Sequence, residues 1–393
     1  MATDREREAR SPEMTAPASA LHDPASRAVP IEPAASAAPP ESELSPDQLS
    51  LVARLRQPRT IVSLVLPIVL LVLFVRSLPG FRLEELPGKI LAANPGLLGL
   101  AFVVFYLGFP LRGYRWARLV RATGFHLPTF DATEIIFVSW LVNCLVPAKL
   151  GDLYRAWLLK VNSPVSLSRT FGTVFIERVL DLFAIVVLGL ASGFVSFRNG
   201  LPGDVQAVFA IGIGVVILLA AGLLTLRNFG RRILDRLPVP HTIVEFYDRF
   251  EEGVFSVGMR SMPILVIVTG LIWSTEALRL LFVVEALHLP GVHLGISGAF
   301  FVALTGSLLT AVPLTPAGIG IVEAGVVGIL TIVYGIGQGD AFTITLVDRT
   351  ISVLSIIALG SIAYAVSPLR RGAGIGGAAT RQQSGSRSAS DAS

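Results

Sequence analysis

Charged residues are scarce in this chain, and cysteine is almost absent. Asp, Glu, Lys and Arg make up 15% of the 393 residues, whereas soluble domains carry about 25%. This low charge, with a mean hydropathy of +0.68, argues against a soluble domain and indicates a membrane protein. The single cysteine, Cys144, excludes an intramolecular disulfide and a cysteine-based metal site.

Motifs for energy-coupled chemistry are missing as well. The sequence contains no G-x-x-x-x-G-K-[ST] loop, so we expect no ATP-hydrolysing motor in this chain. Paired aspartates of D-x-D form are absent from the predicted outer loops. Their absence argues against a glycosyltransferase that uses lipid-linked sugars. We therefore expect no catalytic residue, no metal and no cofactor. The net charge of +4 lies mostly between apolar segments and indicates membrane topology, not nucleic-acid binding.

Long apolar segments are what the chain does have. Several approach the roughly 20 residues that a helix needs to cross a bilayer, and the alternation typical of a membrane barrel is absent. We predict an all-α polytopic membrane protein. Its full spans lie near residues 60–78, 96–118, 170–196, 205–226, 262–287 and 340–366. Two further apolar segments, near 132–160 and 293–336, bring the hydrophobic segments to eight or nine.

The two ends of the chain have a different composition. Residues 1–58 are rich in Ala, Pro, Ser and Glu, and residues 368–393 are rich in Gly, Ser and Ala. Such segments cannot bury a core, so we expect disordered cytoplasmic tails on either side of a membrane domain at 59–367. No early apolar segment suits a cleavable signal peptide. Within the domain, residues 229–258 predict an amphipathic helix, either on the inner membrane surface or packed on the bundle.

One short motif occurs twice, once inside each of the two additional apolar segments. Residues 147–153 match residues 316–322 at a constant separation of 169 (316 − 147). Pro removes an amide donor and Gly permits a tight turn, so each motif should break a helix. Duplicated broken helices in a membrane are typical of transporters built from repeats. The predicted break residues are Pro147, Gly151, Thr315, Pro316, Gly318 and Gly320.

Lys and Arg mark cytoplasmic loops and so predict the topology. Basic clusters at 54–59, 227–236 and 370–371 place both termini inside, and the absence of Lys and Arg from 288–340 places that stretch outside. Basic residues flank the segment 132–160 on both sides, which favours a re-entrant hairpin over a full span. By the same logic, the second hairpin enters from outside.

The two repeat units, at about 96–196 and 262–366, would then have opposite orientations. This predicts an inverted-repeat helical bundle with six full spans and two re-entrant hairpins.

Polar residues in these units predict a binding site. A charge at membrane depth costs about 2.5–3.5 kcal/mol on insertion scales, so it needs a partner or a wet cavity. The candidate headgroup-binding residues are Arg112, Arg115, Asn143, Lys149, Asp152, Arg155, Glu177, Arg178, Asp181, Glu276, Arg279, Glu323 and Arg349. We expect phosphate contact from Lys149, Arg155, Arg178 and Arg349, and orienting or proton-carrying roles for Asn143, Glu177, Asp181 and Glu323. Asp348 with Arg349 holds a place in the second unit similar to that of Glu177 with Arg178.

Purely structural roles for the same residues stay open as alternatives. The group formed by Glu177, Arg178 and Asp181 could neutralise itself and only lock helix packing. Arg112 and Arg115 could anchor a span at the interface, and the hairpin tips could simply satisfy their own backbone.

The chain resembles the family of the lysylphosphatidylglycerol synthase transmembrane (flippase) domain over residues 60–366. The resemblance rests on Arg112-x-x-Arg115-Trp116, on Asn143 with the motif from Pro147 to Arg155, on Glu177-Arg178-x-x-Asp181, and on Thr315-Pro316-x-Gly318-x-Gly320-x-x-Glu323. It implies translocation of a polar-headgroup or polyprenyl-linked lipid between leaflets of a bacterial cytoplasmic membrane, with a membrane lipid as substrate and a separate lipid-synthesis enzyme as a candidate partner.

In the synthase, this domain moves aminoacylated phosphatidylglycerol made by a fused catalytic domain. Here about 27 residues follow the last predicted span (393 − 366), so we expect no synthase activity. A membrane-embedded enzyme that modifies headgroups with Glu177 and Asp181 as acid and base is an alternative. A non-transporting scaffold of a lipid-synthesis complex is another.

Overall fold

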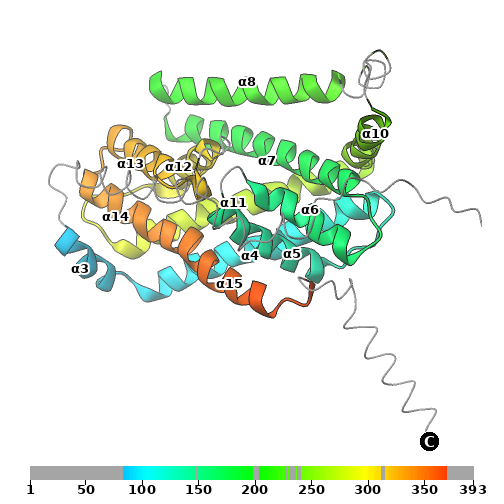
Figure 1. Cartoon of the computed structure of the whole chain (residues 1–393). Helices are drawn as coiled ribbons and strands as arrows, with labels where there is room; N and C mark the ends of the chain where they lie inside the picture. Colours follow the sequence, from blue (N-terminus) through cyan, green and yellow to red (C-terminus); the bar gives the residue numbers. More distant parts are fainter. Residues whose placement is uncertain are drawn as a thin grey trace, which may run out of the picture. The chain divides into compact units, whose positions relative to one another are not determined.

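The computed structural model describes residues 83–146, 149–197, 203–225, 229, 236, 240–310 and 315–369. These residues belong to the unit Leu44–Ser393. The predicted first span at 60–78, the N-terminal tail and nearly all of the C-terminal tail lie outside them. Every regular element among the described residues is a helix (Figure 1).

Four helical segments are long and apolar enough to cross a membrane. They are Pro95–Ala122, Leu167–Ser196, Met259–Leu287 and Gln338–Val366, and they confirm the spans predicted near 96–118, 170–196, 262–287 and 340–366. The chain is therefore a polytopic helical membrane protein. The first two segments are α4 and α7, and the third contains α11 (Met262–Leu287). Helix α8, Gly203–Thr225, coincides with the span predicted at 205–226, and its described apolar part is Ala210–Thr225.

The fourth long segment is not a uniform helix. It consists of α14 (Gln338–Arg349), a π-helical segment η6 (Thr350–Leu354) and α15 (Ser355–Val366). Such π-helical turns are rare and occur frequently at functional sites. This one begins directly after Asp348 and Arg349, two members of the charged cluster described below.

The two additional apolar segments each form two short helices separated by a break. The first contains α5 (Thr129–Leu145) and α6 (Leu150–Asn162). The second contains α12 (Gly295–Leu309), the short turn η5 (Pro316–Gly318) and α13 (Ile321–Ile332). Each of these helices is shorter than the roughly 20 residues of a full span.

Left-handed backbone conformations mark both breaks. Lys149 has a φ of 51°, and Ala317, Gly318 and Gly320 have φ values of 51°, 71° and 89°. A left-handed residue cannot continue a right-handed helix, so the chain changes direction at these positions. Pro147 lies outside the described residues.

Helices α4 and α11 form the centre of the bundle and run antiparallel. Asn94 N donates a hydrogen bond to Ala286 O at one end, whereas Arg115 meets Thr269 toward the other. The helices approach closely at Gly108, where an added Cβ would lie 2.9 Å from Thr275 Oγ1. Small residues allow this kind of close packing between membrane helices. The core around them includes Phe105 and Trp116, both fully buried.

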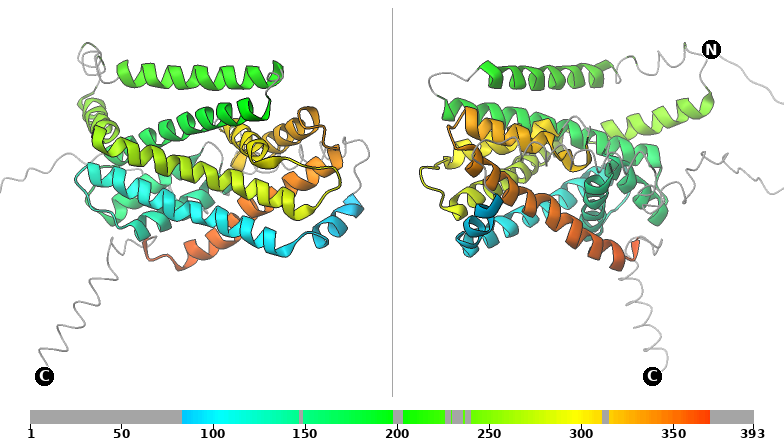
Figure 2. Two further views of the ribbon diagram at one scale, coloured as in Figure 1. Left: turned by 180° about the vertical axis from the view of Figure 1, so that it is seen from behind. Right: turned by 60° about the vertical axis from the view of Figure 1, so that its left-hand side comes forward.

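The short helices pack around this pair. Helix α5 contacts α4, α6 and α15, and α12 contacts α7, α11 and α13. The turn η5 also contacts α5, which brings the second break against the first broken segment. Helix α8 lies beside α7 at the edge of the bundle in all views (Figures 1 and 2).

Helix α10 (His241–Phe255) lies within the range predicted to be amphipathic, and it packs against α7. Two glycines face each other at this crossing: a Cβ on Gly172 would lie 2.9 Å from the Gly253 Cα. Arg169 pairs with Glu252 beside them. The backbones of α7 and α10 are therefore in direct contact, while the membrane-surface position of α10 stays a prediction.

Candidate functional site

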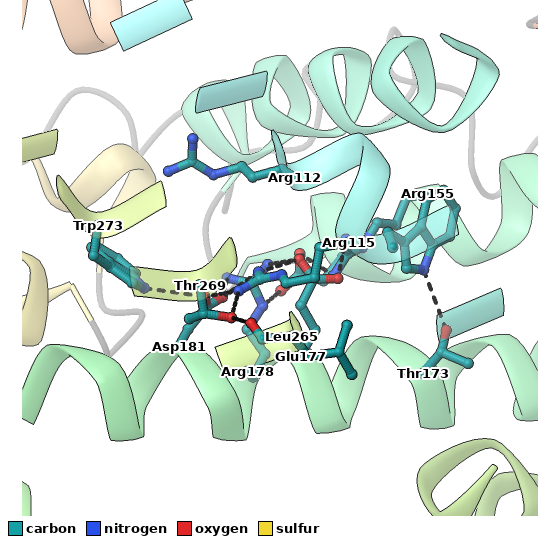
Figure 3. Close-up of polar contacts among 12 residues, drawn as sticks. Arg112, Arg115, Arg155, Thr173, Glu177, Arg178, Asp181, Leu265, Thr269 and Trp273 are labelled. Carbon is teal, nitrogen blue, oxygen red and sulfur yellow. Dashed lines mark hydrogen bonds and ion pairs between the residues drawn. The ribbon is translucent and has the colours of Figure 1, made fainter. Parts of the chain in front are cut away.

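A buried cluster of charged side chains lies between the long helices and the two breaks. Arg115 of α4 is at its centre, with a side chain that is 1% exposed. Its guanidinium donates to Glu177 Oε1 at 2.7 Å, to Asp181 Oδ1 at 2.6 Å and to Thr269 Oγ1 at 2.8 Å (Figure 3). Trp273 Nε1 donates to the same Asp181 oxygen at 3.1 Å. Arg115 thereby joins α4, α7 and α11.

Two more arginines surround the carboxylates of α7. Arg155 of α6 donates to Glu177 Oε2 at 2.9 Å, and both side chains are buried. Arg178 lies 3.3 Å from Asp152, 3.4 Å from Asp181 and 3.8 Å from Glu177. Its side chain is 37% exposed, whereas that of Arg155 is 2% exposed.

A second group of ion pairs continues the cluster toward α14. Arg112 of α4 donates to Glu276 of α11 at 2.7 Å, and Arg279 lies 3.3 Å from the same carboxylate. Arg279 also pairs with Asp348 of α14 at 3.0 Å. The two guanidinium groups stack on aromatic rings, Arg112 on Trp140 at 4.6 Å and Arg279 on Phe105 at 5.1 Å.

Glu323 and Arg349 close the second break. The Glu323 carboxylate accepts a hydrogen bond from Gly320 N at 2.6 Å and another from Arg349 Nε at 2.7 Å. Arg349 also donates to the carbonyl oxygen of Ala317. Both the helix start and the cation at this break are therefore occupied by groups of the chain itself.

The ion pairs of the two units correspond. Asp152 pairs with Arg178 and Glu323 with Arg349, and the residue numbers differ by 171 in both cases (323 − 152; 349 − 178). Asp152 and Glu323 are each the third residue of the helix that follows a break.

The acidic residues that precede the two arginines, Glu177 and Asp348, differ by the same 171 (348 − 177). Each binds a cation from the first long helix of its unit, Arg115 of α4 or Arg279 of α11. Both repeat units thus use one arrangement of charges.

The first break is less completely occupied. Asn143 Oδ1 accepts a hydrogen bond from Gly151 N at 2.8 Å, so a neutral amide takes the place that Glu323 holds at the second break. Lys149 is partly exposed and forms no ion pair with a described residue. The first break therefore presents one cation that has no carboxylate partner.

All of the predicted polar site residues lie among the described residues, and most of them belong to three neighbouring groups of ion pairs, which together we call the charged cluster. Asn143 lies beside it and binds the first break. Arg112 and Arg115 are only 4% and 1% exposed, so they are buried partners and not the interfacial anchors considered above. Thr315, Gly318 and Gly320 lie in the second break, whereas the side chain of Pro316 is not described.

Sequence reasoning missed Thr269 and Trp273, which bind Arg115 and Asp181. A signal for them exists, because Thr269, Trp273 and Glu276 follow the i, i+4, i+7 spacing of one helical face. No group of His, Cys, Asp and Glu among the described residues is placed to hold a metal ion. The carboxylates of the cluster face guanidinium groups instead.

Comparison with known sequences identifies relatives of this chain. A UPF0104 membrane protein of Methanocaldococcus jannaschii is 37% identical over 225 residues, which cover 57% of this chain and 92% of the relative. Another UPF0104 membrane protein, of Methanothermobacter thermautotrophicus, is 27% identical over 325 residues, which cover 74% of this chain and 93% of the relative. Glycosyltransferase AglD of Haloferax volcanii is 28% identical over 312 residues, 70% of this chain but 49% of that enzyme.

The sequence model of the lysylphosphatidylglycerol synthase TM region matches residues 60–360, most of the chain and all of the charged cluster. The expected resemblance is confirmed, and the protein belongs to the lysylphosphatidylglycerol synthase TM region family.

Proposed function

We propose that this protein translocates a lipid with an anionic headgroup between the leaflets of its membrane. One observation carries the proposal: a buried charged cluster lies between two broken helical segments of a protein that otherwise has long apolar helices. Burying so many charges is costly in a membrane, and such residues usually serve transport or binding. A headgroup at the cluster would keep its acyl chains in the bilayer.

The proposed architecture is an inverted repeat of six spans and two re-entrant hairpins. The equal offset of the paired residues in the two units supports the repeat. The short lengths of α5, α6, α12 and α13 favour hairpins, the distribution of Lys and Arg favours entry from opposite sides, and the contact between η5 and α5 favours tips that meet. Both termini would be cytoplasmic. Rocking of one repeat against the other would expose the site alternately to each leaflet.

A liposome experiment tests this function. Purified protein is reconstituted with phosphatidylglycerol that carries the fluorophore NBD on an acyl chain, and dithionite is added outside to quench the exposed label. We expect the inner-leaflet pool to become accessible in protein-containing liposomes, whereas protein-free liposomes should retain it. Retention of that pool with every lipid tested would contradict translocation and favour the scaffold.

The similarity to glycosyltransferase AglD favours a second candidate, an enzyme that modifies lipid headgroups with Glu177 and Asp181 as acid and base. Mass spectrometry of the liposome lipids separates the two, since translocation leaves the lipid unchanged. A lipid of altered mass would support the enzyme. The substrate of a transporter could come from a separate lipid-synthesis enzyme, a partner that co-purification would reveal.

The bacterial cytoplasmic membrane stays a prediction from the resemblance, because the relatives named above are archaeal.

A further inference from the structure

The two breaks differ in how many of their cationic and N–H groups are already bound by other groups of the chain. At the second break, Glu323 accepts from both Gly320 N and Arg349, and Arg349 donates again to Ala317 O. The Arg349 side chain is 16% exposed. A carboxylate of the protein thus already holds the position in which a ligand anion would meet this cation.

At the first break, the corresponding arginine is not used in this way. Arg178 has its closest carboxylate contact at 3.3 Å, and its Nε makes no hydrogen bond. Its side chain is 37% exposed, more than twice the exposure of Arg349. Lys149 lies at the same break without an ion-pair partner among the described residues. Lys149 is therefore a cation without an ion pair, and Arg178 beside it is partly exposed although it shares three carboxylates, whereas Arg349 at the other break is held by Glu323.

The formal charges of the cluster indicate the charge that a bound ligand would have to carry to neutralise it. Its carboxylates are Asp152, Glu177, Asp181, Glu276, Glu323 and Asp348. Its arginines are Arg112, Arg115, Arg155, Arg178, Arg279 and Arg349. These two sets cancel one for one, so Lys149 leaves a formal charge of +1. One negative charge from a ligand would neutralise the cluster.

We infer that the first break alone binds the headgroup, through Lys149 and Arg178, and that the transported lipid carries a single net negative charge on a phosphodiester. This inference rests on the proposed function and names its substrate class. Two donor side chains suit the two free oxygens of a phosphodiester. A dianionic headgroup would leave one negative charge uncompensated at membrane depth, and a zwitterionic one would bring its own cation beside Lys149.

Flipping rates of two matched lipids test the inference. Liposomes receive NBD-phosphatidylglycerol, which has one negative charge, or NBD-phosphatidylcholine, which is zwitterionic and has the same labelled chain. We expect phosphatidylglycerol to move about tenfold faster or more, the effect of one charge-assisted contact. Lys149→Gln should remove most of this difference, whereas Lys149→Arg should keep it.

Arg121→Gln is the matched control. Arg121 is an exposed arginine in the last turn of α4 and lies outside the cluster, so its loss should leave both rates unchanged. Arg349→Gln tests the other half of the inference. In protein that remains folded, this variant should keep the preference for phosphatidylglycerol, and loss of the preference would show that the second break also binds the headgroup.

The possible failures are distinguishable. Equally fast movement of both lipids would overturn the single-charge assignment and leave translocation intact. If neither lipid moves, titration calorimetry of the purified protein with soluble dihexanoyl-phosphatidylglycerol decides. Binding that Lys149→Gln abolishes would retain the site and reject translocation, and absence of binding would reject both. Displacement by equimolar inorganic phosphate would identify a free-anion site and overturn the lipid assignment.

Discussion

The backbone of Gly151 in α6 lies directly against the carbonyl group of Ser139 in α5. A Cβ built on Gly151 would lie 2.1 Å from the Ser139 oxygen and 2.6 Å from Asn143 Oδ1. Contacts under 3.0 Å to backbone atoms require the helices to move apart. The geometry of the first break therefore depends on the absence of a side chain at this position.

Gly151→Ala should open the first break. The methyl group would push α6 away from α5, strain the hydrogen bond from Gly151 N to Asn143, and shift Lys149 at the tip. We expect lower thermal stability in detergent and slower lipid movement in liposomes. Gly328→Ala is the control, because a Cβ on that helical glycine of α13 meets nothing within 4 Å. Equal behaviour of the two variants would contradict the tight crossing.

Arg115→Met should destabilise the protein severely. The substitution leaves Glu177 and Asp181 buried without their main cation, and breaking a buried ion pair from one side costs about 3–5 kcal/mol. A thermal unfolding series in detergent measures the loss. Arg121→Met, which removes an exposed arginine from the same helix, should change the melting temperature little. A stable Arg115→Met protein would mean that Arg155 and Arg178 neutralise the carboxylates alone.

The corresponding ion pairs of the two units should have different coupling energies. Double-mutant cycles with neutral amide variants would compare Asp152–Arg178 with Glu323–Arg349. The first pair is longer and partly exposed, so we expect at most about 1 kcal/mol. The second, at 2.7 Å and more buried, should give about 1.5–3 kcal/mol. A stronger first pair would contradict the assignment of Arg178 as the available cation.

Cysteine labelling tests the re-entrant topology. Cys144 is buried and is the only cysteine, so Cys144→Ala provides a background for single reporters. His126→Cys and Ser163→Cys flank α5 and α6, and both should react with an impermeant maleimide from the cytoplasmic side. His293→Cys should react from the opposite side. Labelling of the reporters at 126 and 163 from different sides would show that α5 and α6 together cross the membrane.

The sequence predicts those features of the fold that depend on neighbouring residues in the chain. Apolar length located four long helices, and the spacing of Pro and Gly predicted where the two interrupted segments change direction. Charge pairing over long separations could not be predicted in this way. Arg115 finds its partners 62, 66 and 154 residues away, and nothing local to Arg115 indicates them.

The burial of Arg112 and Arg115 inside the bundle could not be predicted from the sequence either. Hydropathy ended the second predicted span near residue 118, which suggested an interfacial position for Arg112 and Arg115. Helix α4 continues to Ala122, and the neighbouring helices cover both arginines. The π-helical turn Thr350–Leu354 left no mark in the apolar pattern either, because its backbone differs from an α-helix without a Pro or Gly to signal it.

The glycine crossing of α7 and α10 has a mechanical consequence. Because neither Gly172 nor Gly253 has a side chain that could adjust, the backbones of the two helices are in direct contact. Glu177 lies five residues beyond Gly172 on the same helix. Any displacement of α10, caused by a protein bound there or by the surrounding bilayer, would reach Glu177 within two helical turns and Asp181 within three.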